Sequence, residues 1–193
     1  MDKPIDIPGI RNITISGRIA SGATTLAHHV SKALHWEVLD GGKIFREFTK
    51  DHGFAADRPD QFDLDFEEKI KNMLRTDEHQ IIQSHLAGFD AQGIDGVFKV
   101  LVICEDENGE DKADIRIDRL ANRDVSSVEQ AKHEVLERES QNLEKWRKLY
   151  ANGDQEWVNW DKKYYDLVVN TFMHNQEESL DLVMKALEKK DAA

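Results

Sequence analysis

Residues 17–25 constrain the fold of this chain more than any other part of its sequence. They read Gly-Arg-Ile-Ala-Ser-Gly-Ala-Thr-Thr, with two glycines five positions apart and two threonines close behind the second. An apolar run around Ile13 and Ile15 precedes them, and an amphipathic stretch with Leu26 and Val30 on one face follows. A strand, a glycine-rich turn and a helix in this order are typical of a loop whose backbone amides bind phosphate groups.

We therefore interpret residues 17–25 as a phosphate loop rather than as an ordinary glycine turn. We expect Gly17, Arg18, Ser21, Gly22, Ala23, Thr24 and Thr25 to bind the phosphates of a nucleotide cofactor. The hydroxyl of Thr24 is the candidate ligand for a magnesium ion. Ala23 stands where loops of this type carry a lysine, so the usual cation of the loop is absent.

Strand patterns alternate with helix patterns along the rest of the chain. Further strands are predicted at residues 36–39, 79–84, 97–104 and 165–170. Helices are predicted within residues 26–34, 44–48, 62–74, 112–122, 126–151 and 180–187. For the long helix, Ser126 and Glu129 form a candidate capping box at the start, and Asn152 and Gly153 mark the end. This order predicts an α/β fold with a doubly wound parallel sheet in three layers and a ligand site beyond the carboxyl ends of the strands.

Composition restricts the class of protein and its partners. A chain of 193 residues with 39% hydrophobic and 33% charged residues suits one globular domain, alone or with a smaller mobile part. Its net charge of −12 repels nucleic-acid polymers and anionic membranes, so we expect neither as a partner. No apolar run approaches the roughly 20 residues of a membrane helix, and the first residues do not resemble a signal peptide. We expect a cytoplasmic protein and a monomer.

Several short motifs in this order resemble the cytidylate kinases of the nucleoside monophosphate kinase group, especially the short archaeal and bacterial type. The resemblance covers nearly the whole chain and depends on order and spacing more than on any one motif. The motifs are Ile-Thr-Ile-Ser-Gly at 13–17 with the phosphate loop, Gly-Gly-Lys-Ile-Phe-Arg at 41–46, Leu-Ala-Gly-Phe at 86–89, Arg116, Arg119, Arg123-Asp124, Arg138-Glu139, Trp146-Arg147, Tyr150 and Tyr-Asp-Leu-Val-Val-Asn-Thr at 165–171.

The resemblance implies a single P-loop kinase domain over residues 1–193 that transfers a phosphoryl group from ATP, with Mg²⁺, to a pyrimidine nucleoside monophosphate. CMP or dCMP is the expected acceptor, with CDP or dCDP as the product. The core would comprise residues 1–39, 75–111 and 154–193. Residues 40–74 would form the insertion that binds the monophosphate, and residues 112–153 would form an arginine-rich lid.

The resemblance also implies roles for individual residues. As catalytic residues, Arg119 and Arg123 would close over the ATP phosphates from the lid, and Arg138 would reach the transferred group, because cations neutralise the charge of the phosphate oxygens. The acceptor would be bound by Gly41, Gly42, Arg46, His85, Gly88 and Arg138. An alternative for each lid arginine is a solvated surface position paired with a nearby glutamate. We take the acidic residues of the helix at 62–74 as solvated, with a base contact by Asp63 or Asp65 as the alternative.

The chain departs from the family pattern at Ala23, at Gln83 and His85, where an acid and an arginine are usual, and at Lys43, where an acid is common. One hypothesis is that Lys43, Arg18 or a protonated His85 restores the missing positive charge. Two alternative functions stay open: a nucleotide-binding protein of this fold with weakened or lost catalysis, and a kinase for another small acceptor such as a nucleoside or metabolite.

Overall fold

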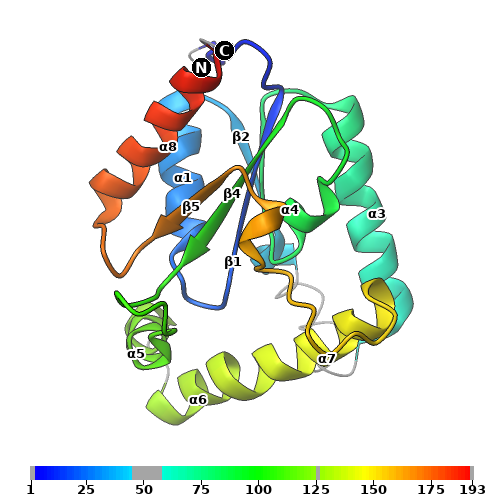
Figure 1. Cartoon of the computed structure of the whole chain (residues 1–193), viewed down its shortest axis with the longest axis vertical. Coiled ribbons are helices and arrows are strands. Elements are labelled where there is room, and N and C mark those ends of the chain that lie inside the picture. The colour runs from blue at the N-terminus through cyan, green and yellow to red at the C-terminus, as the bar shows by residue number, and fades with distance from the viewer. Residues whose placement is uncertain (1–2, 45–57, 125–126, 192–193) are drawn as a thin grey trace.

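A parallel sheet forms the middle layer of the structure (Figure 1). The computed structural model describes residues 3–44, 58–124 and 127–191. Within these residues the sheet has five strands in the order β2-β3-β1-β4-β5, and every neighbouring pair is parallel. The strands are β1 (Asn12–Gly17), β2 (Glu37–Asp40), β3 (Gln80–Gln83), β4 (Val97–Ile103) and β5 (Leu167–Asn170). The predicted α/β fold with a doubly wound parallel sheet is confirmed.

The central strand β1 determines where a ligand can bind. All of its residues are buried, because β3 and β4 flank it and helices cover both faces of the sheet. Ile15 lies opposite Gln83 in β3 and opposite Val100 in β4. The chain first builds the sheet on the β3 side of β1 and then crosses to the β4 side. In doubly wound sheets this reversal opens a crevice at the carboxyl ends of the strands.

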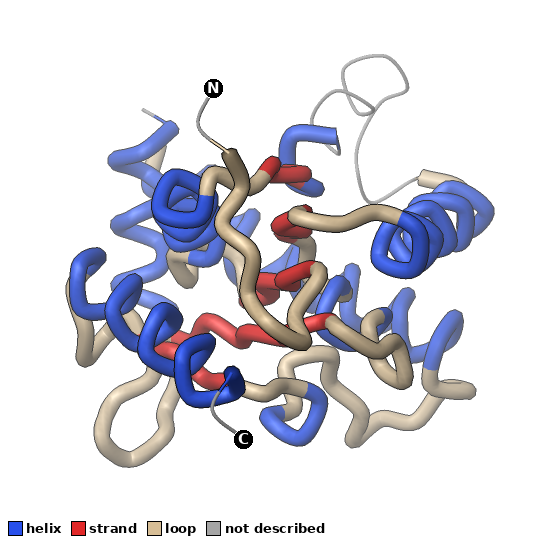
Figure 2. The backbone as a smooth tube through the Cα atoms, turned by 90° about the horizontal axis from the view of Figure 1, so that it is seen from above, coloured by secondary structure: helices blue, strands red, loops and turns tan. Residues whose placement is uncertain are grey.

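Helices cover both faces of the sheet, as the view from above shows (Figure 2). On one face, α1 (Ala23–Leu34) packs beside α8 (Gln176–Asp191). On the other face lie α3 (Asp60–Thr76) and the short α4 (Ala87–Asp90). The first core includes Ile13, Val30, Val100, Val183 and Leu187, and the second includes Phe66, Ile70, Leu74, Ile82 and Val97.

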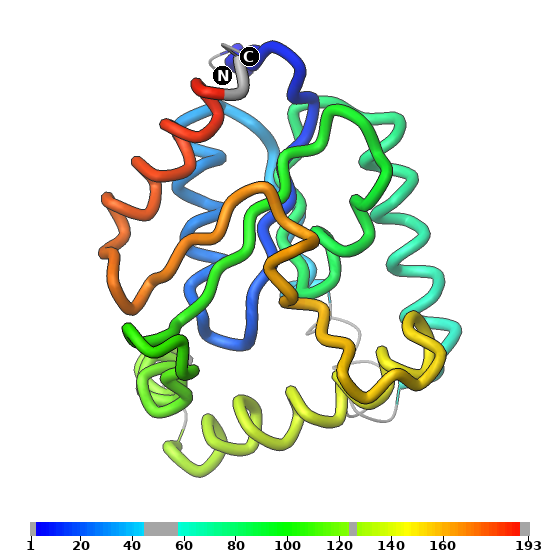
Figure 3. Tube along the Cα trace, in the orientation of Figure 1, coloured from blue at the N-terminus to red at the C-terminus, as the bar shows by residue number. Residues whose placement is uncertain are grey.

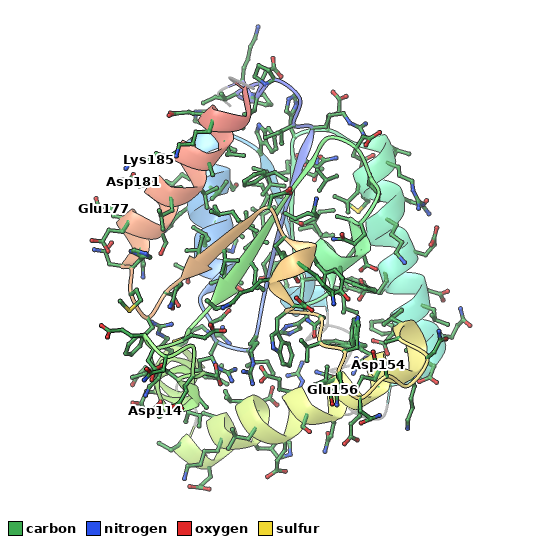
Figure 4. The ribbon with its side chains drawn as sticks, viewed as in Figure 1. Asp114, Asp154, Glu156, Glu177, Asp181 and Lys185 are labelled. Atoms are coloured by element: carbon green, nitrogen blue, oxygen red, sulfur yellow. The ribbon has the colours of Figure 1, made fainter. Side chains whose placement is uncertain are left out.

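The spacing of polar and apolar residues along α8 predicts which side of this helix packs against the sheet. Glu177, Asp181 and Lys185 follow one another at four-residue steps, are exposed, and point away from the sheet (Figure 4). Val183 and Leu187 are buried against the sheet on the opposite side of the helix. The polar and apolar stripes of the sequence therefore fix the orientation of α8.

A third group of helices lies across the carboxyl ends of the strands (Figure 3). It comprises α5 (Ala113–Asp124), α6 (Val128–Lys132) and α7 (Glu139–Tyr150). A π-helical turn over His133–Arg138 joins α6 to α7. The sequence predicts an unbroken helix in this region, and the π turn is a difference from that expectation.

The cap of this long helix is a second difference. The capping box is formed by Ser127 and Gln130, one residue beyond the predicted pair of Ser126 and Glu129. Ser127 has the extended backbone of an N-cap residue, and its hydroxyl accepts from the Gln130 amide at 3.2 Å. The predicted end is confirmed, because the Gly153 amide donates to the Arg147 carbonyl at 2.8 Å after a left-handed Asn152.

The division into a core, a monophosphate-binding insertion (40–74) and a lid (112–153) stays a prediction. The arrangement is compatible with it, since α5, α6 and α7 face the carboxyl ends of the strands as a separate group (Figure 1). In the part of the chain that the structure describes, no helix is both long enough and apolar enough to cross a membrane.

Candidate active site

A cleft of about 780 Å³ opens where the strands end. Its floor is formed by the phosphate loop after β1, and its walls include Gly41, Gln83 and Thr171, which follow or end β2, β3 and β5. Residues of α3, α5, α6, the π turn, α7 and α8 also line the walls. A volume of this size lies in the range of small-molecule sites, roughly 300–1,000 Å³.

Both glycines of the phosphate loop are required by its geometry. Gly22 has a left-handed backbone with φ of +103°, and it directly precedes α1. At Gly17, an added Cβ would lie 2.4 Å from the Ser21 Oγ and 2.7 Å from the carbonyl oxygen of Val102. Any side chain at Gly17 would therefore push apart the two ends of the loop.

The start of α1 offers a place for an anion. The first helical hydrogen bond is donated by the Leu26 amide to the Gly22 carbonyl, at 3.0 Å. The amides of Ala23, Thr24 and Thr25 precede it and have no helical acceptor. The Ser21 Oγ is also buried without a hydrogen-bond partner among the described residues. These groups fit a phosphate, which accepts from several donors at once.

The loop is also suited to a divalent cation that takes some of its ligands from the protein and the others from the bound phosphates. The Thr24 hydroxyl donates to the Gln83 Oε1 at 3.2 Å, so two neutral oxygens meet beside the loop. Among the described residues, no group of three or more His, Cys, Asp or Glu side chains is arranged to bind a metal. Mg²⁺ commonly takes one or two protein ligands and completes its shell with phosphate oxygens and water.

Most predicted site residues that the structure describes meet at this cleft. Its walls include Gly17, Arg18, Ser21, Gly22, Ala23, Thr24, Thr25, Gly41, Gly42, His85, Arg119, Arg123 and Arg138. Arg46 lies outside the described residues. Gly88 is not among the wall residues, because its amide donates to the Ser16 Oγ at 2.9 Å and its Cα faces the ring of Tyr165.

The arginines at the cleft are held in different ways. Arg119 donates to the carbonyl of Thr171 at 2.8 Å and to its Oγ1 at 2.9 Å. Thr171 in turn donates from Oγ1 to the Ser21 carbonyl at 2.6 Å, so Arg119 is linked to the phosphate loop. Arg138 pairs with Glu134 one turn earlier on the same helix. Arg123 is exposed at the rim.

The structure argues against the three proposed replacements for the loop lysine. Lys43 is exposed and does not line the cleft. The guanidinium of Arg18 is ion-paired with Glu139 and Asp111, which neutralise its charge. Burial lowers the pKa of His85, which disfavours the protonated ring, and its Nδ1 donates to the Gly17 carbonyl at 2.8 Å.

The prediction that the acidic residues of α3 are solvated is wrong for Asp63 and Glu67. The Asp63 side chain is 1% exposed and pairs with Arg58 at 2.8 Å and with Lys145 at 2.7 Å. Glu67 is 4% exposed and lines the cleft beside Asp90. Burial and the Asp90 carboxyl raise the pKa of Glu67 well above its usual range. Positions 63 and 67 share the three- and four-residue spacing of the apolar face, and this signal could have identified them.

Aromatic residues that precede the last strand, β5, pack together in one cluster. Trp157 is buried with Leu86 and Trp146, and Tyr164 packs against the same cluster. The single cysteine, Cys104, is buried, and burial raises the pKa of its thiol.

The fold and this cleft define the class of the protein as a P-loop kinase. Solved structures agree in fold: a gluconokinase from Sinorhizobium meliloti 1021 matches with a TM-score of 0.58 at 14% identity, covering 96% of this chain and 95% of that chain. A shikimate kinase from Acinetobacter baumannii in complex with shikimate matches with a TM-score of 0.52 at 16% identity, covering 95% and 94%. At these identities the likeness shows the fold alone.

Sequence comparison defines the family. The chain is 31% identical over 183 residues to the cytidylate kinase of Haloarcula marismortui, covering 91% of this chain and 88% of that protein. It is 32% identical over 166 residues to the cytidylate kinase of Natronomonas pharaonis, covering 82% and 80%. No protein-family model matches the chain. The similarity to these relatives shows that the chain belongs to the cytidylate kinase family.

Proposed function

We propose that this protein transfers the γ-phosphoryl group of ATP to a pyrimidine nucleoside monophosphate, with CMP or dCMP as the preferred acceptor. The observation that carries the proposal is one cleft that holds a phosphate loop together with Arg119, Arg123 and Arg138. Phosphoryl transfer depends mainly on in-line positioning of two phosphate groups and on cations around the transferred one. Membership in the cytidylate kinase family supports the choice of acceptor.

At the donor end, the amides before Leu26 and the Ser21 hydroxyl would bind the ATP phosphates. Thr24 and Gln83 would hold a divalent cation, which supplies positive charge at the phosphate oxygens. Arg119 would contact the same oxygens from the opposite wall, because Thr171 fixes its guanidinium close to the loop. These contacts would hold the terminal phosphoryl group toward the middle of the cleft.

At the acceptor end, the backbone at residues 41 and 42 would approach the monophosphate. The Cα of Gly41 is packed so closely that a Cβ would lie 2.8 Å from Ser84 Cβ, so a larger residue would displace this wall. Phe66 and Trp146 add apolar ring surface suited to a planar base. Arg138 would lie between the two ends and stabilise the charge of the transferred group. We retain Arg46 as a proposed ligand of the acceptor phosphate.

The test is a coupled assay of ADP release with Mg²⁺ and ATP and each of CMP, dCMP, UMP, AMP and free cytidine. We expect the highest kcat/KM with CMP or dCMP, and a fall of about 100-fold or more in kcat for Arg138→Ala. Lys148→Ala, an exposed change on the same helix, is the matched control and should leave kcat unchanged. A preference for UMP, AMP or free cytidine would contradict the proposed acceptor.

A second candidate, nucleotide binding without turnover, is favoured by one observation: neither Arg18 nor His85 offers a free positive charge in place of the lysine missing at Ala23. Ala23→Lys separates the two candidates. Thermal stabilisation of the natural protein by ATP without turnover, together with activity in the variant, would establish the second. Turnover of CMP by the natural protein would establish the first and show that the lysine is dispensable here.

A further inference from the structure

A cluster of four charged side chains joins α7 to the phosphate loop. The members are Arg18, Asp111, Arg116 and Glu139. Glu139 accepts from the Ile19 amide through Oε2 at 3.0 Å and from the Arg18 Nε through Oε1 at 2.8 Å. Arg116 donates from Nη1 to the Ile19 carbonyl at 2.8 Å and to the Glu139 Oε2 at 3.0 Å. The lid region thus binds both polar backbone groups of one residue of the loop.

Charge within the cluster is balanced, so it needs no ligand to hold it together. Asp111 Oδ2 lies 2.7 Å from Arg116 and 3.2 Å from Arg18, which makes two carboxylates for two guanidiniums. The Arg116 side chain is 0% exposed and that of Glu139 9%. Burial alone would raise the pKa of Glu139, but Arg116 and Arg18 outweigh it and hold that pKa below its usual value. The Trp160 ring lies 4.6 Å from the Arg18 guanidinium and covers it.

The position of Glu139 in its helix links the cluster to the cleft. It is the first residue of α7, and Arg138, which lines the cleft, directly precedes it at the end of the π turn. Consecutive helical residues point about 100° apart around the helix axis. Fixing the direction of Glu139 therefore fixes the direction of Arg138. The π turn needs such a restraint, because its hydrogen-bond geometry differs from that of the α-helices on either side.

We propose that Glu139 is a positioning residue: it fastens α7 to the phosphate loop, and it thereby sets the direction in which Arg138 enters the cleft. The fastening consists of contacts within the chain and does not depend on the proposed function. Only the effect on turnover rests on the proposed function. The two parts are therefore tested separately.

The first test is amide hydrogen exchange in the nucleotide-free protein, measured by NMR at Ile19. In Glu139→Ala the exchange at Ile19 should become about tenfold faster or more, because its acceptor is lost. Glu139→Gln keeps the size of the side chain and an acceptor oxygen, and it should give a smaller increase. Glu144→Gln, an exposed change on the same helix, is the control and should leave Ile19 unchanged.

Unchanged exchange at Ile19 in both Glu139 variants would overturn the fastening. If Glu139→Ala does not fold, the exchange rate at Ile19 in Glu139→Gln is the deciding measurement, because this variant removes only the charge.

The second test asks whether Glu139 acts through Arg138. With ATP and CMP, Glu139→Gln should lower kcat by about 10- to 100-fold while both KM values change by no more than about twofold. In an Arg138→Ala background the same change should have little further effect, since the two residues act as one unit. Equal losses in both backgrounds would indicate a merely structural role and would overturn the positioning proposal. Absence of turnover in the natural protein would contradict the proposed function and leave the exchange test valid.

Discussion

Two groups of acidic side chains, one beside the phosphate loop and one beside α3, differ in their partners. Beside the phosphate loop, Asp111 and Glu139 each contact Arg116 at 3.0 Å or less. On the side of the cleft formed by α3, Glu67 and Asp90 lie against each other, and the partly exposed Lys71 approaches Asp90 at 3.3 Å. The first group, the balanced one, has one arginine for each carboxyl, whereas in the second, the unbalanced one, two carboxyls face the ammonium of Lys71.

This difference gives the same kind of residue opposite responses to pH. Arginine partners hold the pKa of Glu139 low, so its contribution to stability is present above its unfolded-state pKa and is lost as the pH falls through the folded value. Burial and Asp90 raise the pKa of Glu67, so the folded state keeps a proton that the unfolded state releases. Stability from Glu67 therefore decreases as the pH rises from its unfolded-state pKa toward its folded one.

The largest effect should come from breaking the balanced group. Arg116→Met would leave Asp111 and Glu139 to share the single guanidinium of Arg18, and we expect a loss of about 3–5 kcal/mol in the free energy of unfolding. Urea denaturation at pH 7 measures it. Lys148→Met, which removes an exposed cation on α7, is the control. A loss no larger than in this control would show that the cluster contributes nothing to stability.

A smaller effect, of opposite sign, is expected in the unbalanced group. Glu67→Gln removes a carboxyl that neighbours Asp90 and Asp63, and it should raise the free energy of unfolding at pH 7 by about 0.5–2 kcal/mol. The gain should shrink as the pH is lowered toward the usual carboxyl range. Glu68→Gln, on the exposed side of α3, should show neither change. A destabilised Glu67→Gln protein at neutral pH would contradict the assignment of a raised pKa.

The smallest effect tests the contribution of Lys71. Its side chain is 29% exposed, so solvent screens its attraction for Asp90. Lys71→Met should lower the free energy of unfolding at pH 7 by about 0.5–1 kcal/mol. The same change made in the Glu67→Gln background should cost less, because the side-chain amide introduced at position 67 can donate to Asp90 instead. Equal costs in both backgrounds would mean that Lys71 and Glu67 do not share Asp90.

Local patterns predicted the fold because the decisive signals are short in sequence. Five strands alternate with amphipathic helices, and the spacing of Gly17 and Gly22 identifies a loop whose geometry excludes larger residues. The capping box is misplaced by one residue because Ser126 and Ser127 are adjacent and each is followed three positions later by a suitable partner. The π turn leaves no local signal of this kind.

The sequence predicted many of the residues that line the cleft, but it did not predict the ion pairs that they form. Arg116 was noted only as a motif residue of the predicted lid, with a solvated surface position as the alternative, and it is instead fully buried beneath the loop. Its partners Asp111 and Glu139 are 5 and 23 residues away along the chain, and Arg18 is 121 residues from Glu139. Which acids neutralise which arginines depends on tertiary contacts that composition and periodicity do not encode.

The close packing at Gly88 matters for anyone who scans this protein by saturation mutagenesis. A Cβ at this position would lie 2.2 Å from the Tyr165 ring. Tyr165 donates to the carbonyl of Asn159 at 2.6 Å, and Asn159 donates to the carbonyl of His85 at 2.9 Å. A displacement of Tyr165 would therefore move Asn159 and, through it, His85 at the cleft wall. An activity screen would score Gly88 as intolerant, although it does not line the cleft, and its neighbours in such a map would be Tyr165 and Asn159.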